Sequence, residues 1–377
     1  MSNHDKQLNI AMLGHKRIPS REGGIEVVVE ELSKRMVQKN HHVTCFNRKG
    51  HNVAGDEYDI ASLDEYAGIH LKDVWTIDKK GLAAMTASVS ASVKAALGKF
   101  DVVHIHAEGP AFMCWLPKLF GKKVIVTVHG LDHQRAKWGK LASTYIMMGE
   151  KNAVRFADEI IVLSKGVKQY FLDTYQRETQ FIPNGVSPRI SRVAVQITEK
   201  YRLHKNDYIL FLGRMVPEKG IEYLIKAFKQ VKTDKKLVIA GGTSDTDAFY
   251  SELKELSKDD DRIIFTGFVQ GRLKHELYSN AYVYTLPSDL EGMPLSLLEA
   301  MSYGNCCLVS DIAECKEVIE DKALTFKKSD IDDLRDKLQY LCDYKETVDE
   351  YKYNAATFIC NKYSWDDVVD RTLELYR

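Results

Sequence analysis

Two glutamates, Glu291 and Glu299, stand in the segment LPSDLEGMPLSLLEAMSYG, between two apolar runs that are typical of strands. This pattern predicts a strand, a tight loop and a helix. Gly292 permits a sharp turn, and Pro294 suits a first helical residue, so the helix should begin near Pro294 and end at Gly304. Glu291 then lies on the loop before a helix N-terminus, which favours anions such as diphosphate. Glu299 lies inside the helix, where its carboxylate suits the hydroxyls of a ribose.

Both acids could instead be solvated surface side chains, which is the commonest state of a glutamate. The context of Glu299 argues against this, because it interrupts the apolar stretch LSLLEAM in a segment flanked by buried-type strands. A carboxylate in such a place needs a partner.

Three further groups of residues follow predicted strands. Arg214 and Lys219 stand on the loop after YILFLG, where both could reach one anion. His129 follows KVIVTV at the carboxyl end of a strand, which is where ligands bind in open α/β sheets. Gly23 and Gly24 separate the first strand from the first helix and would let backbone N–H groups approach a phosphate. The alternatives are surface charges, a structural histidine and a flexible turn.

The composition limits the kinds of protein that this sequence can form. The 377 residues suffice for two domains, and the 53 basic residues equal the 53 acidic ones, which gives no sign of nucleic-acid binding. Seven cysteines without a CxxC pair favour a reducing compartment. The N-terminus lacks a signal-peptide layout, so we expect a cytoplasmic protein. The segment Trp115–Lys123 mixes apolar and basic residues, and peripheral contact with the inner face of the cell membrane is an alternative to an ordinary amphipathic helix.

Strand-like and helix-like segments alternate along the chain, which predicts an α/β fold with parallel sheets covered by helices on both faces. The turn at Asn184-Gly185 and the strand-free stretch 187–205 place a domain boundary there. We therefore expect domains over 1–186 and 187–363. The closing helix is amphipathic, and its apolar side carries Trp365, Val368, Val369, Leu373 and Tyr376.

The pattern E-G-x-P-x-x-x-x-E over 291–299, together with R-x-x-x-x-K over 214–219, resembles the signature of retaining glycosyltransferases of the GT-B architecture, in the glycogen-synthase-like group known as family 4. The string IPSREGGIE resembles the N-terminal loop of members that make capsule and rhamnose-containing polymers. The resemblance covers nearly the whole chain. It implies two Rossmann-like doubly wound domains facing across a cleft, the first binding the acceptor and the second the nucleotide-sugar donor, with helix 364–377 packing back on the first.

The resemblance also implies residue roles. Glu291 would lie by the donor sugar, Glu299 would bind the ribose, and Arg214 with Lys219 would bind the diphosphate. His129 would contact the sugar beside the reacting carbon. The rest of the implied donor-binding set consists of main-chain and loop residues: Gly23, Gly24, Phe268, Val269, Gly292, Met293, Pro294 and Leu295.

No metal or cofactor is expected. His104 and His106 share one strand face, but no third ligand is evident, so we interpret them as core or pocket-edge residues. Asp245 and Asp247 form a DxD, the metal-nucleotide signature of a different transferase architecture, and we interpret them as helix N-terminal caps.

The predicted function is transfer of a sugar from a nucleoside diphosphate sugar to a hydroxyl of a carbohydrate or lipid-linked acceptor, in synthesis of a cell-surface polysaccharide or glycolipid. A UDP-sugar is favoured, and dTDP-rhamnose is kept open by the IPSREGG loop. A sugar-nucleotide epimerase or a phosphorylase on the same architecture is the alternative. A nicotinamide dehydrogenase would need GxGxxG after the first strand, and a two-domain solute-binding protein would be exported and gives no reason for the Arg, Lys and Glu set.

Overall fold

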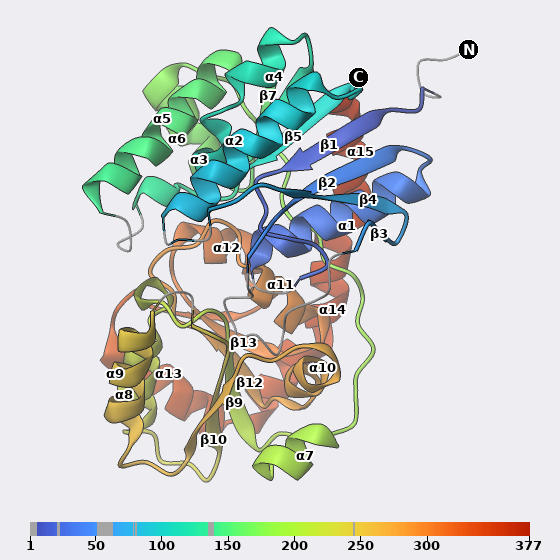
Figure 1. The fold of residues 1–377 in the computed structure, drawn as a ribbon. Helices are drawn as coiled ribbons and strands as arrows, with labels where there is room; N and C mark the ends of the chain where they lie inside the picture. Colours follow the sequence, from blue (N-terminus) through green and yellow to red (C-terminus); the bar gives the residue numbers. More distant parts are fainter. Residues whose placement is uncertain are drawn as a thin grey trace. The chain divides into compact units, whose positions relative to one another are not determined.

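The computed structural model describes residues 6–20, 23–50, 63–77, 79, 81–134, 139–243 and 246–377. The chain forms two compact units (Figure 1). Unit 1 comprises Met1–Asn184 and Trp365–Arg377, and unit 2 comprises Gly185–Ser364. Each unit is an α/β structure built on one sheet, as the alternating pattern predicts.

The sheet of unit 1 has the order β3-β4-β2-β1-β5-β6-β7-β8, and every pairing is parallel except that of β3 with β4. Its strands are β1 (Asn9–Leu13), β2 (His42–Arg48), β3 (Glu65–Tyr66), β4 (Ile69–Val74), β5 (Val102–His106), β6 (Lys123–Val128), β7 (Glu159–Val162) and β8 (Gln180–Phe181). The central strands are buried and rich in apolar residues because both faces of a parallel sheet are covered by helices.

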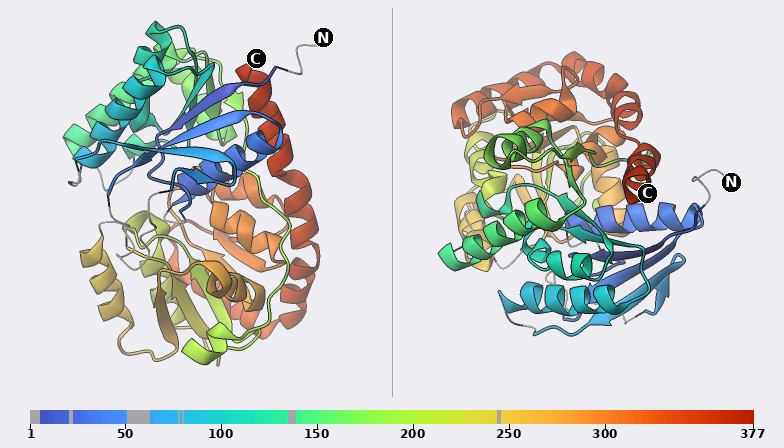
Figure 2. Two further views of the ribbon diagram at one scale, coloured as in Figure 1. Left: turned by 45° about the vertical axis from the view of Figure 1, so that its right-hand side comes forward. Right: turned by 90° about the horizontal axis from the view of Figure 1, so that it is seen from above.

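The helices of unit 1 can be followed in Figure 2. They are α1 (Gly24–Gln38), α2 (Leu82–Leu97), α3 (Glu108–Ala111), α4 (Trp115–Leu119), the 3₁₀ turn η3 (Asp132–Gln134), α5 (Lys140–Phe156), α6 (Lys165–Tyr175) and α15 (Trp365–Tyr376). Helix α1 contacts α15, whereas α2, α3, α4 and α5 contact one another.

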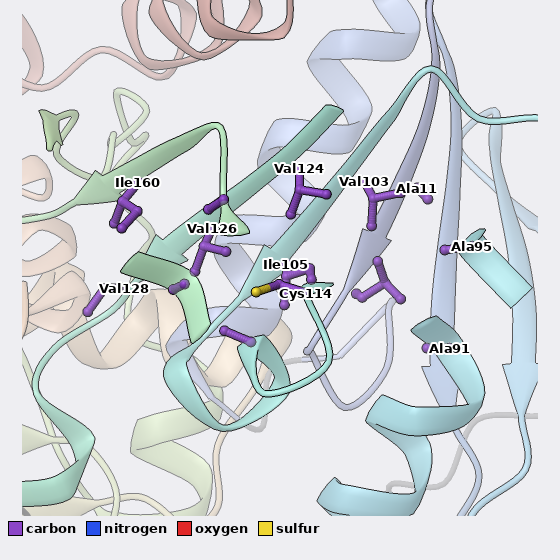
Figure 3. Packing of buried hydrophobic residues seen from close by; sticks show 14 of the residues in the cluster. Ala11, Ala91, Ala95, Val103, Ile105, Cys114, Val124, Val126, Val128 and Ile160 are labelled. Atoms are coloured by element: carbon purple, nitrogen blue, oxygen red, sulfur yellow. The ribbon is translucent and has the colours of Figure 1, made fainter. Parts of the chain in front are cut away.

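One face of the sheet packs against α2, α3, α5 and α6, and Figure 3 shows part of this core. Alternate residues of each strand point into it, as the two-residue period of a strand requires. The labelled members are Ala11, Val103, Ile105, Val124, Val126, Val128 and Ile160 from strands, Ala91 and Ala95 from α2, and Cys114 between α3 and α4.

The remaining alternate residues of the strands point to the opposite face of the sheet, which packs against α1 and α15. Nδ1 of His104 lies 2.5 Å from the hydroxyl of Tyr376, and Oγ of Ser33 lies 3.5 Å from Sγ of Cys45. All five apolar residues predicted for the inner side of the closing helix are buried. Helix α15 therefore completes the core of unit 1, although the 180 residues of unit 2 separate it from the rest of that unit along the chain.

The sheet of unit 2 is wholly parallel, with the order β11-β10-β9-β12-β13-β14. Its strands are β9 (Tyr208–Leu212), β10 (Lys236–Ala240), β11 (Ile263–Gly267), β12 (Val283–Leu286), β13 (Cys306–Ser310) and β14 (Leu324–Phe326). Its helices are α7 (Gln196–Tyr201), η4 (Pro217–Lys219), α8 (Ile221–Phe228), α9 (Asp247–Ser257), α10 (Gly271–Asn280), α11 (Leu295–Ser302), α12 (Ala313–Ile319), α13 (Ile331–Asp343) and α14 (Lys345–Lys362). In Figure 1, α8, α9 and α13 lie on one side of this sheet and α10, α11 and α14 on the other.

Two helix starts differ from the sequence analysis. Pro294 occupies the N-cap position of α11, so the first helical residue is Leu295. Asp247 was predicted as a cap but is the first residue inside α9, because Thr246 takes the cap position and donates its hydroxyl to the carbonyl of Met215 at 2.5 Å. Asp245 lies outside the described residues. Across the described ranges, every helix is too short or too polar to traverse a lipid bilayer.

The packing of α15 predicts the effect of Trp365→Ala. Trp365 is buried, and the guanidinium of Arg35 lies 5.9 Å from its ring centre. Truncation should lower the free energy of unfolding of unit 1 by about 3–5 kcal/mol, the usual cost of emptying a buried aromatic site. Urea denaturation followed by circular dichroism measures this. Leu141→Ala, at a residue of the same unit that is 90% exposed, is the control and should change stability by less than about 0.5 kcal/mol; an equal effect of both changes would contradict the packing role.

Candidate functional site

The predicted donor residues of unit 2 follow the carboxyl ends of two neighbouring strands. Strands β9 and β12 pair in the middle of the sheet. The chain continues from β9 to β10 on one side and from β12 to β13 on the other. The junction of β9 and β12 is therefore a topological switch point, where the two following loops diverge and leave room for a ligand.

Gly220 brings these two loops into contact. Its φ angle is +65°, and a Cβ atom there would lie 2.0 Å from the carbonyl oxygen of Pro287. A backbone hydrogen bond of 2.9 Å from the N–H of Asp289 to the carbonyl of Glu218 joins the same loops. Only glycine fits this conformation and this close approach.

The contact places Lys219 beside Glu291. Nζ of Lys219 donates to Oε1 of Glu291 at 2.5 Å, and Oγ of Ser288 donates to the same oxygen at 2.6 Å. The two charged side chains are only 12% and 8% exposed. The structure thus brings together two residues that the sequence analysis assigned to diphosphate and sugar, directly before the N-terminus of α11. Ser288 was not predicted.

Glu299 has a different cationic partner. Nζ of Lys274, on α10, lies 2.8 Å from each of its carboxylate oxygens. The hydroxyl of Tyr278 donates to Oε2 of Glu299 at 3.4 Å, and Nη2 of Arg189 lies 4.0 Å from Oε1. The interrupted apolar face correctly indicated that Glu299 needs a partner. Lys274 and Tyr278 were missed; their spacing of four residues places them on one face of α10.

The other donor-site candidates of unit 2 lie at the same edge of the sheet. Arg214 follows β9, between the strand and η4, while Phe268 and the buried Val269 follow β11. Gly292, Met293 and Pro294 form the loop into α11, and Leu295 begins the helix. Peptide N–H groups at a helix start are suited to bind an anion.

In unit 1, His129 follows β6 and contacts a buried histidine. Its Nε2 lies 3.0 Å from Nδ1 of His106. Burial holds the pKa of His106 well below its usual value and lowers the pKa of His104 to about 3, so both rings are neutral at physiological pH. Nε2 of His104 lies 2.7 Å from the hydroxyl of Thr127, and with Tyr376 on Nδ1 this ring is fully engaged in the core. His104 is thus a core residue, and His106 supports His129.

Gly23 is the N-cap residue of α1, and Gly24 is its first helical residue. A Cβ atom on Gly23 would lie 2.6 Å from Oε2 of Glu26. The other carboxylate oxygen of Glu26 accepts a hydrogen bond of 2.9 Å from the N–H of Lys16. Arg21 and Glu22 of the IPSREGG loop lie outside the described residues.

Comparisons with known proteins agree with this architecture. Residues 22–189 match the family described as Glycosyltransferase Family 4, and residues 196–358 match Glycosyl transferases group 1. An uncharacterized glycosyltransferase of Methanocaldococcus jannaschii is 25% identical over 98% of both chains. The alpha-D-kanosaminyltransferase of Streptomyces kanamyceticus is 24% identical over 73% of this chain and 76% of its own.

Solved structures show the same fold. Sucrose-phosphate synthase from Thermosynechococcus elongatus superposes with a TM-score of 0.80 at 20% identity, covering 98% of each chain. Anabaena HepE in complex with UDP-glucose superposes with a TM-score of 0.80 at 15% identity, covering 98% of this chain and all of its own (100%).

The two parallel-sheet α/β units and the superposed structures show the GT-B fold, and the two family matches identify the chain as a glycosyltransferase. The chain belongs to the group 1, family 4 type, with the family 4 match in its N-terminal half and the group 1 match in its C-terminal half.

The close approach at Gly220 predicts a large functional effect of Gly220→Ala. Because the added Cβ would collide with backbone, the Lys219 loop must shift away from the Glu291 loop. We expect kcat/KM to fall on the order of 100-fold, the usual effect of a misplacement of about 1 Å. Steady-state kinetics with a nucleotide-sugar donor measures this.

Gly304→Ala is the matched control, because Gly304 also has a positive φ (+76°) but its Cβ would meet its nearest atom at an ordinary 3.6 Å. Alanine at position 304 is therefore strained by the positive φ angle but does not collide with a neighbouring backbone atom. An equal loss of activity in both variants would show that backbone strain, and not the collision at position 220, causes the loss.

Proposed function

We propose that this protein is a retaining glycosyltransferase that transfers a sugar from a nucleoside diphosphate sugar to a hydroxyl of a carbohydrate or lipid-linked acceptor. The observation that carries the proposal is the Lys219–Glu291 pair at the switch point of unit 2, before the start of α11. Unit 2 would bind the donor and unit 1 the acceptor, for cell-surface polysaccharide or glycolipid synthesis.

The chemistry requires charge stabilisation as the diphosphate departs. Lys219 and Arg214 would supply positive charge, and the N–H groups at the start of α11 would add hydrogen bonds held in place before the reaction. These groups make a divalent ion at the diphosphate unnecessary. In a retaining reaction of this type the leaving phosphate accepts the proton of the acceptor hydroxyl on the same face of the sugar. Glu291 then positions the sugar, His129 contacts it beside the reacting carbon, and no covalent intermediate is needed.

UDP-sugar is the donor we favour, because Anabaena HepE, which shares this fold, was solved with UDP-glucose. The IPSREGG resemblance supports dTDP-rhamnose as the second candidate. A sugar-nucleotide epimerase or a phosphorylase on the same architecture is the alternative function. An assay with a labelled nucleotide sugar separates these activities. A transferase moves the label to the acceptor, whereas an epimerase releases an epimer and a phosphorylase needs phosphate.

Variants of the two glutamates test the site. Glu299→Gln should mainly raise the donor KM, by roughly 10-fold to 100-fold, because a charged hydrogen bond to the ribose contributes about 1.5–3 kcal/mol in ground and transition states alike. Glu291→Gln should instead lower kcat on the order of 100-fold, because a loosely held sugar loses its alignment with the acceptor. Initial-rate kinetics, with the donor chosen by a thermal-shift screen of nucleotide sugars, separates the two effects.

Glu255→Gln is the control, since that side chain is 70% exposed on α9; it should behave as wild type. Circular dichroism must first show each variant folded, because Glu291 also neutralises the largely buried Lys219. Wild-type kinetics in both folded site variants would reject the site. If Glu299→Gln lowers kcat and Glu291→Gln raises the donor KM, the two glutamates have the opposite roles.

We also propose weak contact with an anionic membrane surface on the cytoplasmic side. Leu119 and Phe120 at the end of α4 are 73% and 50% exposed, and Lys118, Lys122 and Lys123 flank them in the sequence. Flotation with phosphatidylserine-containing vesicles should show binding at low ionic strength that is lost as salt is raised. The double change L119S/F120S should abolish flotation and Leu141→Ser should not. Absence of wild-type binding at low salt would favour a soluble acceptor.

A further inference from the structure

Unit 1 contains a buried cluster of three potential metal ligands. Glu108 lies on α3, His133 on η3 and Glu150 on α5. Glu108 is 1% exposed, Glu150 is fully buried, and the His133 side chain is 15% exposed. One oxygen of each carboxylate and one ring nitrogen of His133 lie within 4.8 Å of one another.

The outer atoms of both carboxylates are already engaged. Oε1 of Glu150 accepts hydrogen bonds from the hydroxyls of Tyr170, at 2.9 Å, and Tyr175. Oε2 of Glu108 accepts a hydrogen bond of 2.8 Å from the N–H of Asp132. These bonds fix the orientation of each carboxylate, as the outer partners of metal ligands do.

The inner atoms are unsatisfied. Within the described ranges, Oε1 of Glu108, Oε2 of Glu150 and Nδ1 of His133 are buried and receive no hydrogen bond from an N–H or hydroxyl donor. Burial and the hydrogen-bond contact with Glu150 raise the pKa of Glu108 to about 10, so without a cation the two carboxyls share a proton. Nδ1 of His133 lies 3.4 Å from Oε2 of Glu150, but without hydrogen-bond geometry. Three electron-pair donors therefore converge on one point. Buried carboxylates without compensation are costly, and either a cation or a shared proton must offset them.

Packing enforces this convergence. A Cβ atom at Gly149 would lie 1.9 Å from the carbonyl oxygen of Glu108, so glycine lets α5 touch α3 beside the cluster. A proton shared by the two carboxyls would still leave Nδ1 of His133 without a hydrogen bond, 3.4 Å from Oε2 of Glu150. A cation satisfies all three atoms at once.

We propose that Glu108, His133 and Glu150 bind one divalent transition-metal ion, with Zn²⁺ as the preferred ion and Mn²⁺ as the second. Imidazole favours zinc over magnesium or calcium, and carboxylates complete the nitrogen and oxygen ligand set of zinc sites. The ion would tie η3 to α3 and α5. Because η3 begins three residues after His129, the ion would hold in place the segment that follows this histidine. This site is separate from the diphosphate chemistry of unit 2.

Metal binding can be measured without any transferase assay. Full-length protein without a histidine tag is loaded with Zn²⁺, desalted and analysed for metal by mass spectrometry. We expect about one zinc per chain, a rise in the unfolding temperature with Zn²⁺ and none with Mg²⁺. Glu150→Gln and His133→Gln should each weaken Zn²⁺ binding at least about 10-fold, since loss of even an outer-shell partner costs 10-fold to 100-fold.

Matched controls are Glu178→Gln and His42→Gln, both at exposed positions of unit 1, which should bind Zn²⁺ as wild type does. Failure of wild-type protein to bind Zn²⁺ or Mn²⁺, with no change in unfolding temperature, would overturn the proposal in favour of a shared proton. Unchanged affinity in both cluster variants would also overturn it, by placing the ion elsewhere.

A second measurement covers the case in which the cluster variants do not fold. The Co²⁺-substituted wild-type protein should show no sulfur-to-cobalt charge-transfer band, because the cluster contains no cysteine. The chain has seven free cysteines, so such a band would assign the ion to thiolates and refute the site. Since every readout is metal binding or stability, failure here leaves the proposed transferase function untouched.

Discussion

The ion pair between Lys219 and Glu291 is the interaction on which the arrangement of unit 2 depends. It joins the loops after β9 and β12, and both side chains are almost buried. Removing one partner of a buried pair leaves an uncompensated charge, which typically costs about 3–5 kcal/mol. The pair therefore holds the two loops together when no ligand is present. In the proposed function, the same lysine would become a partner for the phosphate of a bound nucleotide sugar.

Much of this arrangement could be predicted from the sequence, because it follows from local rules. Apolar runs alternating with amphipathic segments predicted two parallel-sheet α/β domains, and the carboxyl ends of parallel strands share one edge of a sheet. That rule put Lys219 and Glu291 at the same edge. It did not predict that β9 and β12 are neighbours, since sequence periodicity carries no information on strand order. Their direct contact depends on this order and on Gly220, whose role as a point of close approach is visible only in three dimensions.

The partners of polar groups were harder to predict than the groups themselves. Glu299 was recognised as an acid that needs compensation, but Lys274 lies on a different helix and was not identified. Glu108, His133 and Glu150 were not singled out, because each lies in a segment that is unremarkable by itself and only the packing of α3 on α5 unites them. Local sequence patterns reveal a buried charge, whereas its partner is a property of tertiary structure.

The largely buried carboxylates of the two units have different partners. In unit 2, Glu291 and Glu299 each have a lysine partner, so an arriving anion can draw on cations that are already in place. In unit 1, Glu108 and Glu150 have tyrosine and backbone donors on one side but no cationic side chain other than His133 among the described residues that contact them. A carboxylate that already has a lysine gains little from a metal ion, whereas a pair without one gains much. This difference in charge compensation is why we propose an anionic ligand for the site of unit 2 and a cation for the cluster of unit 1.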